Sequence, residues 1–350
     1  MQIASVGCAL PEHRYDQAAL IDVISAHWAE HHHNTARLAQ LHSAVQVGTR
    51  HTALPMERYP DLTFGSANQA FIEVGVNLGE AAVSEALEAA HLRPQDVDII
   101  FTTTVTGIAT PSLDARLCNR LDFRTDIKRV PLFGLGCVAG AAGIARVADY
   151  LRGHPGHVAL LLSVELCSLT LQRSDASIAN LIATGLFGDG AACVVVLGED
   201  RAAAERGPRV VASRSRFYPG TERVMGWDIT DNGMQIVLAA SVPAMVEKHI
   251  REDVDSFLAD QGRCRADIRS WVCHPGGPKV LEALQVALEI EREDLGVTWR
   301  SLDAVGNLSS ASVLFVLRDT LAEHRPPPGT PGMILAMGPG FCSELVLLEW

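Results

Sequence analysis

The chain has 350 residues, 48% of them hydrophobic, and a formal net charge of −12 from 29 basic and 41 acidic residues. This length allows two ordinary domains or one large one, and the hydrophobic content is sufficient for a large buried core. The acidic balance excludes a nucleic-acid surface, which needs clustered Lys and Arg. The longest apolar runs, such as 158–162, are far shorter than the ~18 residues that indicate a membrane span, so we expect a soluble protein without one.

The N-terminal segment 1–7 predicts a first β-strand, because it lacks the basic and long apolar regions of a secretory signal. We therefore expect the protein in the cytoplasm. The stretch 27–42 contains the consecutive residues His31, His32 and His33. Their side chains would point in different directions, and no acid or cysteine stands at ligand spacing, so a solvated surface is favoured over a metal site.

Arg50 and His51 follow, and their charge suggests contact with a substrate phosphate. Beyond them, short β-rich runs alternate with Ala-rich helical stretches. The predicted elements are strands at 97–104, 157–164 and 191–198 and a helix at 139–151. This alternation predicts an α/β fold whose sheets are covered on both faces.

Three pairs of segments resemble one another, in the same order in the two parts of the chain. They are 96–103 with 267–274, 136–151 with 306–321, and 187–197 with 337–347. Such repetition predicts two similar halves, 1–205 and 206–350, packed as one body and joined around 200–235, where Pro, Arg and Gly cluster.

One of the eight cysteines stands out by its surroundings, although a free cysteine most often packs as a small buried hydrophobe. Cys137 follows Gly134 and Gly136 and precedes a helix of small residues. Glycines permit a sharp backbone turn, and a helix N-terminus lowers the pKa of a nearby thiol. We therefore predict that Cys137 is a nucleophile.

His274 and Asn307 are the candidate partners of this thiol. His274 ends an apolar strand and begins a Pro/Gly loop, at the end of a strand where ligand crevices form in α/β sheets. Asn307 occupies the place in the second half that Cys137 holds in the first. The alternatives are a packing or capping histidine and an asparagine that serves a turn or helix cap.

These segments together resemble the type III polyketide synthases, the chalcone- and stilbene-synthase-like family of the thiolase-fold condensing enzymes. The resemblance spans nearly the whole chain. Besides the Gly136-Cys137 turn, its marks are the segments 185–190, 274–277, 306–311 and 338–341. It implies a thiolase fold of duplicated, layered αβαβα halves and a homodimer.

The resemblance also implies that coenzyme A thioesters reach a buried Cys-His-Asn site through a pantetheine tunnel, without a bound metal or redox cofactor. Cys137 would take the acyl group of an acyl-CoA starter, and the carbanion formed when malonyl-CoA loses CO₂ would attack it over several rounds. His274 would hold Cys137 as the thiolate. His274 and Asn307 would donate hydrogen bonds to the thioester oxygen as negative charge develops there.

Phe187, by the same resemblance, would gate the tunnel mouth and exclude water from the malonyl group, although a core aromatic is the alternative. The residues that would line the elongation cavity are Val105, Thr106, Cys167, Thr170, Ile236 and Leu238. The cyclisation end would be shaped by Gly338, Pro339 and Gly340. Thr110 stands where the plant enzymes insert a methionine into the partner subunit.

Departures from the plant pattern suggest a cavity suited to an aliphatic chain. Val105 replaces a threonine used in plant cyclisation, Ile236 replaces a bulky phenylalanine, and Thr110 is smaller than methionine. The segment 225–231 resembles bacterial members that make alkylresorcinols or alkylpyrones more than the naphthalene-forming ones.

Three alternative functions remain open at this point. A 3-oxoacyl-carrier-protein synthase III-like enzyme shares the three catalytic residue types, but it usually carries a His-Gln-Ala-Asn motif where this chain has His274-Pro275-Gly276-Gly277. A hydrolase or transferase with a Cys-His site would end in simple deacylation. A binding protein with a decayed site is disfavoured because all three expected catalytic residues are present.

Overall fold

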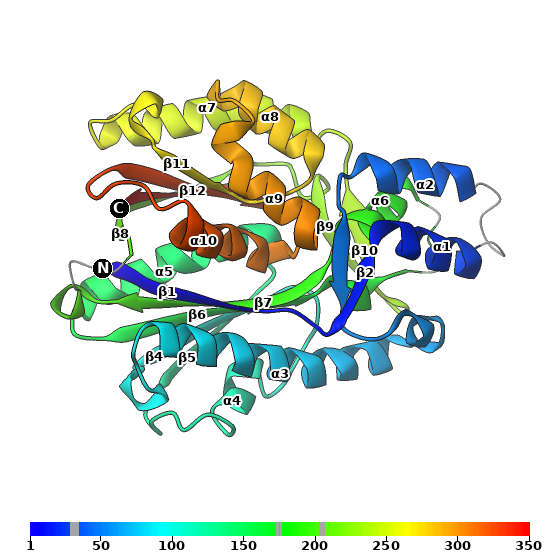
Figure 1. Cartoon of the computed structure of the whole chain (residues 1–350), viewed down its shortest axis with the longest axis horizontal. Coiled ribbons are helices and arrows are strands. Elements are labelled where there is room, and N and C mark those ends of the chain that lie inside the picture. Colours follow the sequence, from blue (N-terminus) through cyan, green and yellow to red (C-terminus); the bar gives the residue numbers. More distant parts are fainter. Residues whose placement is uncertain (29–34, 173–174, 176, 203–206) are drawn as a thin grey trace.

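The computed structural model describes residues 1–350 except 29–34, 173–174, 176 and 203–206. In this part of the chain the largest sheet has nine strands in the order β11-β12-β13-β8-β1-β7-β6-β4-β5. Strands β1 and β8 share only the residue pair Gln2 and Arg209. The sheet therefore consists of two parts that meet at this pair, and Figure 1 shows them as two separate layers.

The first part of the sheet is built by the chain before residue 205. Its strands are β1 (Gln2–Ala9), β4 (Ile99–Thr104), β5 (Lys128–Phe133), β6 (Val158–Leu166) and β7 (Asp189–Leu197). Its helices are α3 (Phe64–Ala89), α4 (Leu113–Leu117) and α5 (Ala139–Gly153).

Within the described residues, the second part has a similar order of elements, with one strand fewer and one helix more. Its strands are β8 (Arg209–Phe217), β11 (Ser270–Cys273), β12 (Pro331–Gly338) and β13 (Cys342–Glu349). Its helices are α7 (Val242–Asp260), α8 (Pro278–Leu288), α9 (Gly296–Val305) and α10 (Ser312–Glu323).

The layers form because both faces of the central strands are apolar. Alternate residues of β7 contribute to different cores: Val194 packs with α5 and α10, whereas Val195 packs with α3. On β12, Ile334 likewise faces α5 and α10, and Leu335 faces α7 and α8. Helices α5 and α10 thus lie between the two parts of the sheet, with α3 outside one and α7 and α8 outside the other (Figure 1). This is the predicted αβαβα layering.

Close approach of the two central helices requires small residues. A Cβ atom on Gly140 of α5 would lie 2.4 Å from the carbonyl oxygen of Ser310 and 2.5 Å from a methyl carbon of Val313. The small residues that follow Cys137 therefore let the first helix of one half pack against the corresponding segment of the other.

A smaller group of elements covers one end of the layers (Figure 1). It comprises the strand pairs β2 (His13–Asp16) with β3 (Thr49–Thr52) and β9 (Met225–Thr230) with β10 (Gly233–Leu238). Its helices are α1 (Gln17–Trp28), α2 (Thr35–Ala44) and α6 (Ile178–Leu186). These elements provide one wall of the candidate site.

The α/β prediction is confirmed, and the predicted elements differ from the observed ones by a few residues at their ends. The stretch 200–235 is more than a connection, because it contains β8, which pairs with β13 over most of its length. The division into 1–205 and 206–350 stays a prediction. Residues His31, His32 and His33 lie outside the described residues. No described helix is both long and apolar enough to cross a membrane.

Candidate active site

Cys137 lies in a tight turn between β5 and α5. Gly134 and Gly136 have φ angles of +94° and +55°, which residues with side chains rarely adopt. A Cβ on Gly136 would also lie 2.7 Å from the ring of Pro339. The turn continues as a short 3₁₀ segment, Gly136–Val138, directly into α5. The glycines therefore allow the backbone path that places the thiol at the start of the helix.

Asn307 has a corresponding position at the start of the second central helix. Gly306 has a φ of +74°, and a short 3₁₀ segment, Ser309–Ala311, leads into α10. Asn307 also forms a parallel bridge with Phe187. In this bridge its N–H donates to Leu186 O at 2.9 Å, and its carbonyl accepts from the Gly188 N–H at 3.0 Å.

His274 follows the last residue of β11, and its backbone N–H continues the ladder by donating to Leu335 O at 2.9 Å. Its side chain is only 3% exposed. Neither ring nitrogen has a hydrogen-bond partner among the described residues. A buried polar group without a partner is costly, so this imidazole is suited to a ligand that supplies one.

The three side chains line one cavity of about 430 Å³. Within it, the Cys137 sulfur lies 3.7 Å from Ser309 Oγ, close enough for a hydrogen bond. The Asn307 Oδ1 accepts from the Ser309 N–H at 2.8 Å, which leaves the amide NH₂ to act as a donor. The structure thus brings together the three residues that we singled out as catalytic.

Burial determines the protonation of this cluster. It raises the pKa of the Cys137 thiol to about 12, although hydrogen bonds from Ser309 and Asn307 oppose the rise. It also lowers the pKa of His274 to about 3. The free cavity therefore favours a neutral thiol and a neutral imidazole. The resemblance implies a thiolate at Cys137, whereas burial in the free cavity disfavours the charged form of both groups.

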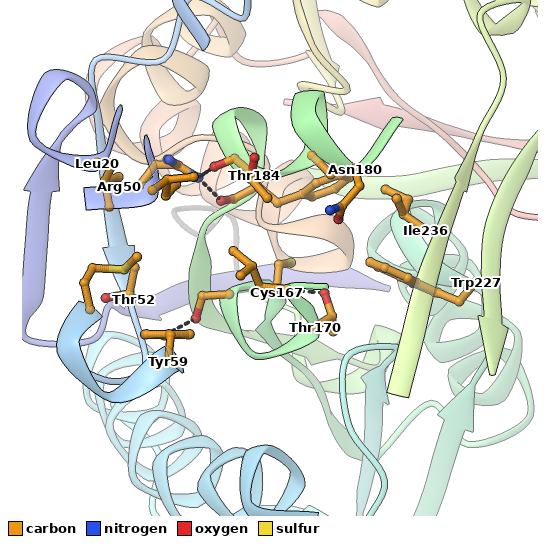
Figure 2. A pocket seen from close by; sticks show the side chains of 16 residues that line it. Leu20, Arg50, Thr52, Tyr59, Cys167, Thr170, Asn180, Thr184, Trp227 and Ile236 are labelled. Carbon is orange, nitrogen blue, oxygen red and sulfur yellow. Dashed lines mark hydrogen bonds between the residues drawn. The ribbon is translucent and has the colours of Figure 1, made fainter. Parts of the chain in front are cut away.

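The expected pocket residues divide among three cavities. The cavity of Cys137 includes Val105, Phe187, Ile236, Leu238 and Pro339. A second cavity, of about 40 Å³, shares Phe187 and Ile236 with it and adds Cys167 and Thr170 (Figure 2). A third, of about 560 Å³, shares Thr170 with the second and adds Thr106. Because neighbouring cavities share lining residues, the three cavities form a series that leads away from Cys137.

The remaining expected residues lie outside these cavity linings. Gly338 instead backs the cysteine turn, where an added Cβ would lie 2.7 Å from Leu135 O. Gly340 has a φ of +72° in the turn between β12 and β13. Thr110 is exposed in the loop before α4.

The expectation that Arg50 contacts a substrate phosphate is wrong, because its side chain is buried and bonded to the backbone. Its residue is only 5% exposed, and its guanidinium donates to the backbone carbonyls of Thr184 and Phe187. The ring of the neighbouring His51 is hydrogen-bonded to Pro11 O. The sequence argument for a phosphate contact used only the charge of these residues. Whether a basic residue is buried depends on tertiary contacts, which the local sequence does not show.

Ser309 and Trp227 are two of the residues that line the cavity of Cys137 and were not in the predicted site. Ser309 contacts the sulfur, and it stands two residues after Asn307 in the segment 306–321, whose resemblance to 136–151 points to it. Trp227 of β9 lies in the wall between the first two cavities. Nothing in its local sequence indicates this, because the contact depends on how β9 and β10 pack against α6.

Comparisons with known proteins agree over the whole chain. Residues 13–211 match the model of FAE1/type III polyketide synthase-like proteins, and residues 209–349 match the C-terminal domain of chalcone and stilbene synthases. A 1,3,6,8-tetrahydroxynaphthalene synthase of Streptomyces peucetius subsp. caesius is 53% identical, over 99% of this chain and 93% of its own. A putative chalcone synthase of Bacillus subtilis is 36% identical, over 99% and 98%.

The same likeness extends to three dimensions. The crystal structure of 1,3,6,8-tetrahydroxynaphthalene synthase from Streptomyces coelicolor A3(2), a bacterial type III polyketide synthase, superposes with a TM-score of 0.94 at 29% identity. It covers 100% of this chain and 99% of that one.

The layered fold and the Cys-His-Asn cavity between its halves define a thiolase-fold enzyme. Within that class, the chain belongs to the type III polyketide synthases, which are decarboxylating condensing acyltransferases. The predicted family and fold are confirmed, and the alternative of a carrier-protein-dependent ketoacyl synthase is not favoured.

Proposed function

We propose that this chain condenses malonyl-CoA repeatedly, with loss of CO₂, onto a starter acyl group held on Cys137, and then closes a ring on the product. The observation that carries this proposal is the shared cavity in which the thiol, the unpartnered imidazole of His274 and the amide of Asn307 meet. The steps need coenzyme A thioesters and no further cofactor.

Loading begins with the neutral pair. As the Cys137 sulfur attacks the thioester of an acyl-CoA, its proton passes to the His274 imidazole. The coenzyme A thiolate then leaves and takes this proton, which restores the neutral imidazole. The unpartnered ring nitrogens support this general-base role, because each is free to take part in the transfer.

Decarboxylation follows in the same cavity. The bond from the malonyl C2 to its carboxylate breaks, CO₂ leaves, and the electron pair forms the enolate of an acetyl thioester. An N–H of His274 and the amide of Asn307 stabilise the oxygen that gains charge. Phe187, Leu238 and Met337 give the cavity an apolar lining, which strengthens these hydrogen bonds by excluding water. The enolate carbon then attacks the acyl carbonyl on Cys137, the bond from that carbonyl to the sulfur breaks, and Cys137 leaves as a thiolate. The extended chain is now a β-keto thioester of coenzyme A. In the next round the Cys137 sulfur takes up this chain and releases the coenzyme A thiolate, which gains a proton.

Ring closure gives an aromatic or pyrone product. The name of the 53% identical relative supports a fused aromatic, whereas the segment 225–231 suggested an alkylresorcinol or alkylpyrone. The comparisons do not support the reading of that segment. Val105 and Ile236 line the cavity, and products formed from a panel of starters distinguish the two product classes.

A homodimer is part of the same proposal. Strand β5 is an edge of the sheet, and a long edge needs a partner or protection. Its last residue, Phe133, is 57% exposed, and Ile108 in the loop that carries Thr110 is 48% exposed. An exposed aromatic residue at the end of an edge strand, and a second exposed apolar residue in the loop that carries Thr110, support contact with a second copy.

Incubation with malonyl-CoA labelled with ¹⁴C, alone and with a panel of acyl-CoA starters, tests the proposal. We expect labelled CO₂ together with a product longer than the starter, identified by mass spectrometry. Release of free coenzyme A without CO₂ or chain growth would instead identify a hydrolase.

A further inference from the structure

Arg50 is a buried cation at the back of the candidate site, outside the chemistry described so far. It belongs to β3 and lines the small cavity between α6 and β10 (Figure 2). Its Nη1 donates to Thr184 O at 2.6 Å and to Phe187 O at 2.8 Å. Both carbonyls belong to the C-terminal end of α6, where helix carbonyls lack partners within the helix. Arg50 therefore fixes the point at which α6 ends and Phe187 begins.

The stem of the same side chain contacts the other strand of the bridge. A Cβ on Gly306 would lie 3.3 Å from both Cγ and Cδ of Arg50, so these carbons lie close to the residue before Asn307. Asn307 is itself tied to Leu186 and Gly188 by two backbone hydrogen bonds. Arg50 thus contacts both segments of the bridge that carries the gate aromatic and the catalytic amide.

This arrangement is not explained by stability alone. Among the described residues, Nε and Nη2 of Arg50 have no hydrogen-bond partner. Asp189 acts on the guanidinium only at longer range. A buried charge with unsatisfied donors is costly, and replacing such groups by apolar residues of similar size is often neutral or stabilising.

We propose that Arg50 is a positioning residue that holds the Phe187–Asn307 bridge in the geometry required for malonyl-CoA decarboxylation. This inference rests on the proposed function of the Cys137 cavity. Arg50 touches no substrate in this role. It acts through the two carbonyls that it binds and through the placement of Gly306.

The test compares Arg50→Met and Arg50→Lys with the unchanged protein. Methionine keeps much of the length of the stem without a donor, and lysine keeps the charge without the planar fork. For each variant, kcat and KM of malonyl-CoA decarboxylation are measured beside the rate of Cys137 acylation by acyl-CoA. Arg265→Met is the matched control, because Arg265 also donates to a carbonyl at the end of a helix, Leu288 O of α8.

We expect both Arg50 variants to lower kcat of decarboxylation by about 10-fold to 100-fold, as for a displaced catalytic group. KM and the acylation rate should stay within about twofold, and the melting temperature should fall no further than in the control. If Arg50→Met does not fold, Arg50→Lys alone decides the matter. Equal losses in decarboxylation and acylation, or no loss in either, would overturn the inference. If the unchanged protein releases no CO₂ from malonyl-CoA, it is the proposed function that fails.

Discussion

The hydrogen-bond donor of Asn307 is the feature whose loss has the most specific expected effect. Asn307→Asp keeps an oxygen that can accept from the Ser309 N–H, a contact of 2.8 Å, and removes the NH₂ group. Asn307→Ala also removes that acceptor and leaves a buried N–H unpaired, which costs about 1–3 kcal/mol of folding stability. The aspartate variant thus separates the lost donor from the lost support of the backbone.

The size of the effect follows from the role of the donor. Removing one donor to a developing oxyanion lowers kcat by about 10²–10³-fold, or about 2.7–4 kcal/mol of transition-state stabilisation. We expect at least this loss in malonyl-CoA decarboxylation for Asn307→Asp, because its carboxylate also repels the enolate. Loading of Cys137 should fall much less, since it does not pass through that enolate.

The assay measures CO₂ release from labelled malonyl-CoA and, in parallel, acyl-enzyme formation by mass spectrometry of the intact protein. Asn180→Asp is the control, because Asn180 is also a buried asparagine whose NH₂ donates to backbone carbonyls. It lines the small neighbouring cavity and not the cavity in which Cys137, His274 and Asn307 meet. This variant should lose stability without changing the ratio of the two rates. Equal loss of decarboxylation and loading in Asn307→Asp would refute the assigned role.

Three further outcomes test other parts of the account. Cys137→Ala should abolish chain growth and leave malonyl-CoA decarboxylation measurable, because the His274 and Asn307 donors remain; an unchanged product yield would contradict the assignment. Burial lowers the pKa of His42 from 6.5 to about 4, so its contribution to stability is present above pH 6.5 and is lost as the pH falls toward 4. In denaturant titrations between pH 7 and pH 4, the free energy of unfolding should therefore fall by about 3 kcal/mol less in His42→Gln than in the unchanged protein. Equal decreases would count against this burial. Gly140→Ala should lower the free energy of unfolding by about 1–3 kcal/mol through overpacking. Gly153→Ala is the control and should be neutral or slightly stabilising, because the added methyl group has open space around it. Similar values for the two variants would contradict the close packing of α5 and α10.

The fold was predictable because its pattern is local and repeated. Apolar strands such as 191–198 are buried on both faces and read as continuous hydrophobic runs, and β7 lies there. The glycines beside Cys137 and Asn307 indicated backbone turns with positive φ angles, which few other residues adopt. These signals sufficed to place two of the catalytic candidates at corresponding helix starts.

Properties that depend on tertiary contacts were not predictable in this way. The raised pKa of Cys137 and the lowered pKa of His274 arise from desolvation, which neighbouring sequence does not reveal. Arg50 stands beside a histidine in an exposed-looking run, yet α6 covers it. The separation of Cys167 from the Cys137 cavity likewise depends on tertiary packing, because Phe187 and Ile236 line both cavities.

The central claim is that the acyl chain is attached to Cys137. It is tested most directly by quenching the reaction during turnover and analysing the peptides of the protein by mass spectrometry. With an acyl-CoA starter and malonyl-CoA present, we predict starter and extended β-keto acyl adducts on the peptide that contains Cys137. These adducts should disappear in the presence of a thiol-alkylating agent that modifies this residue. Adducts on another of the eight cysteines, or product formation without any adduct at Cys137, would contradict the account.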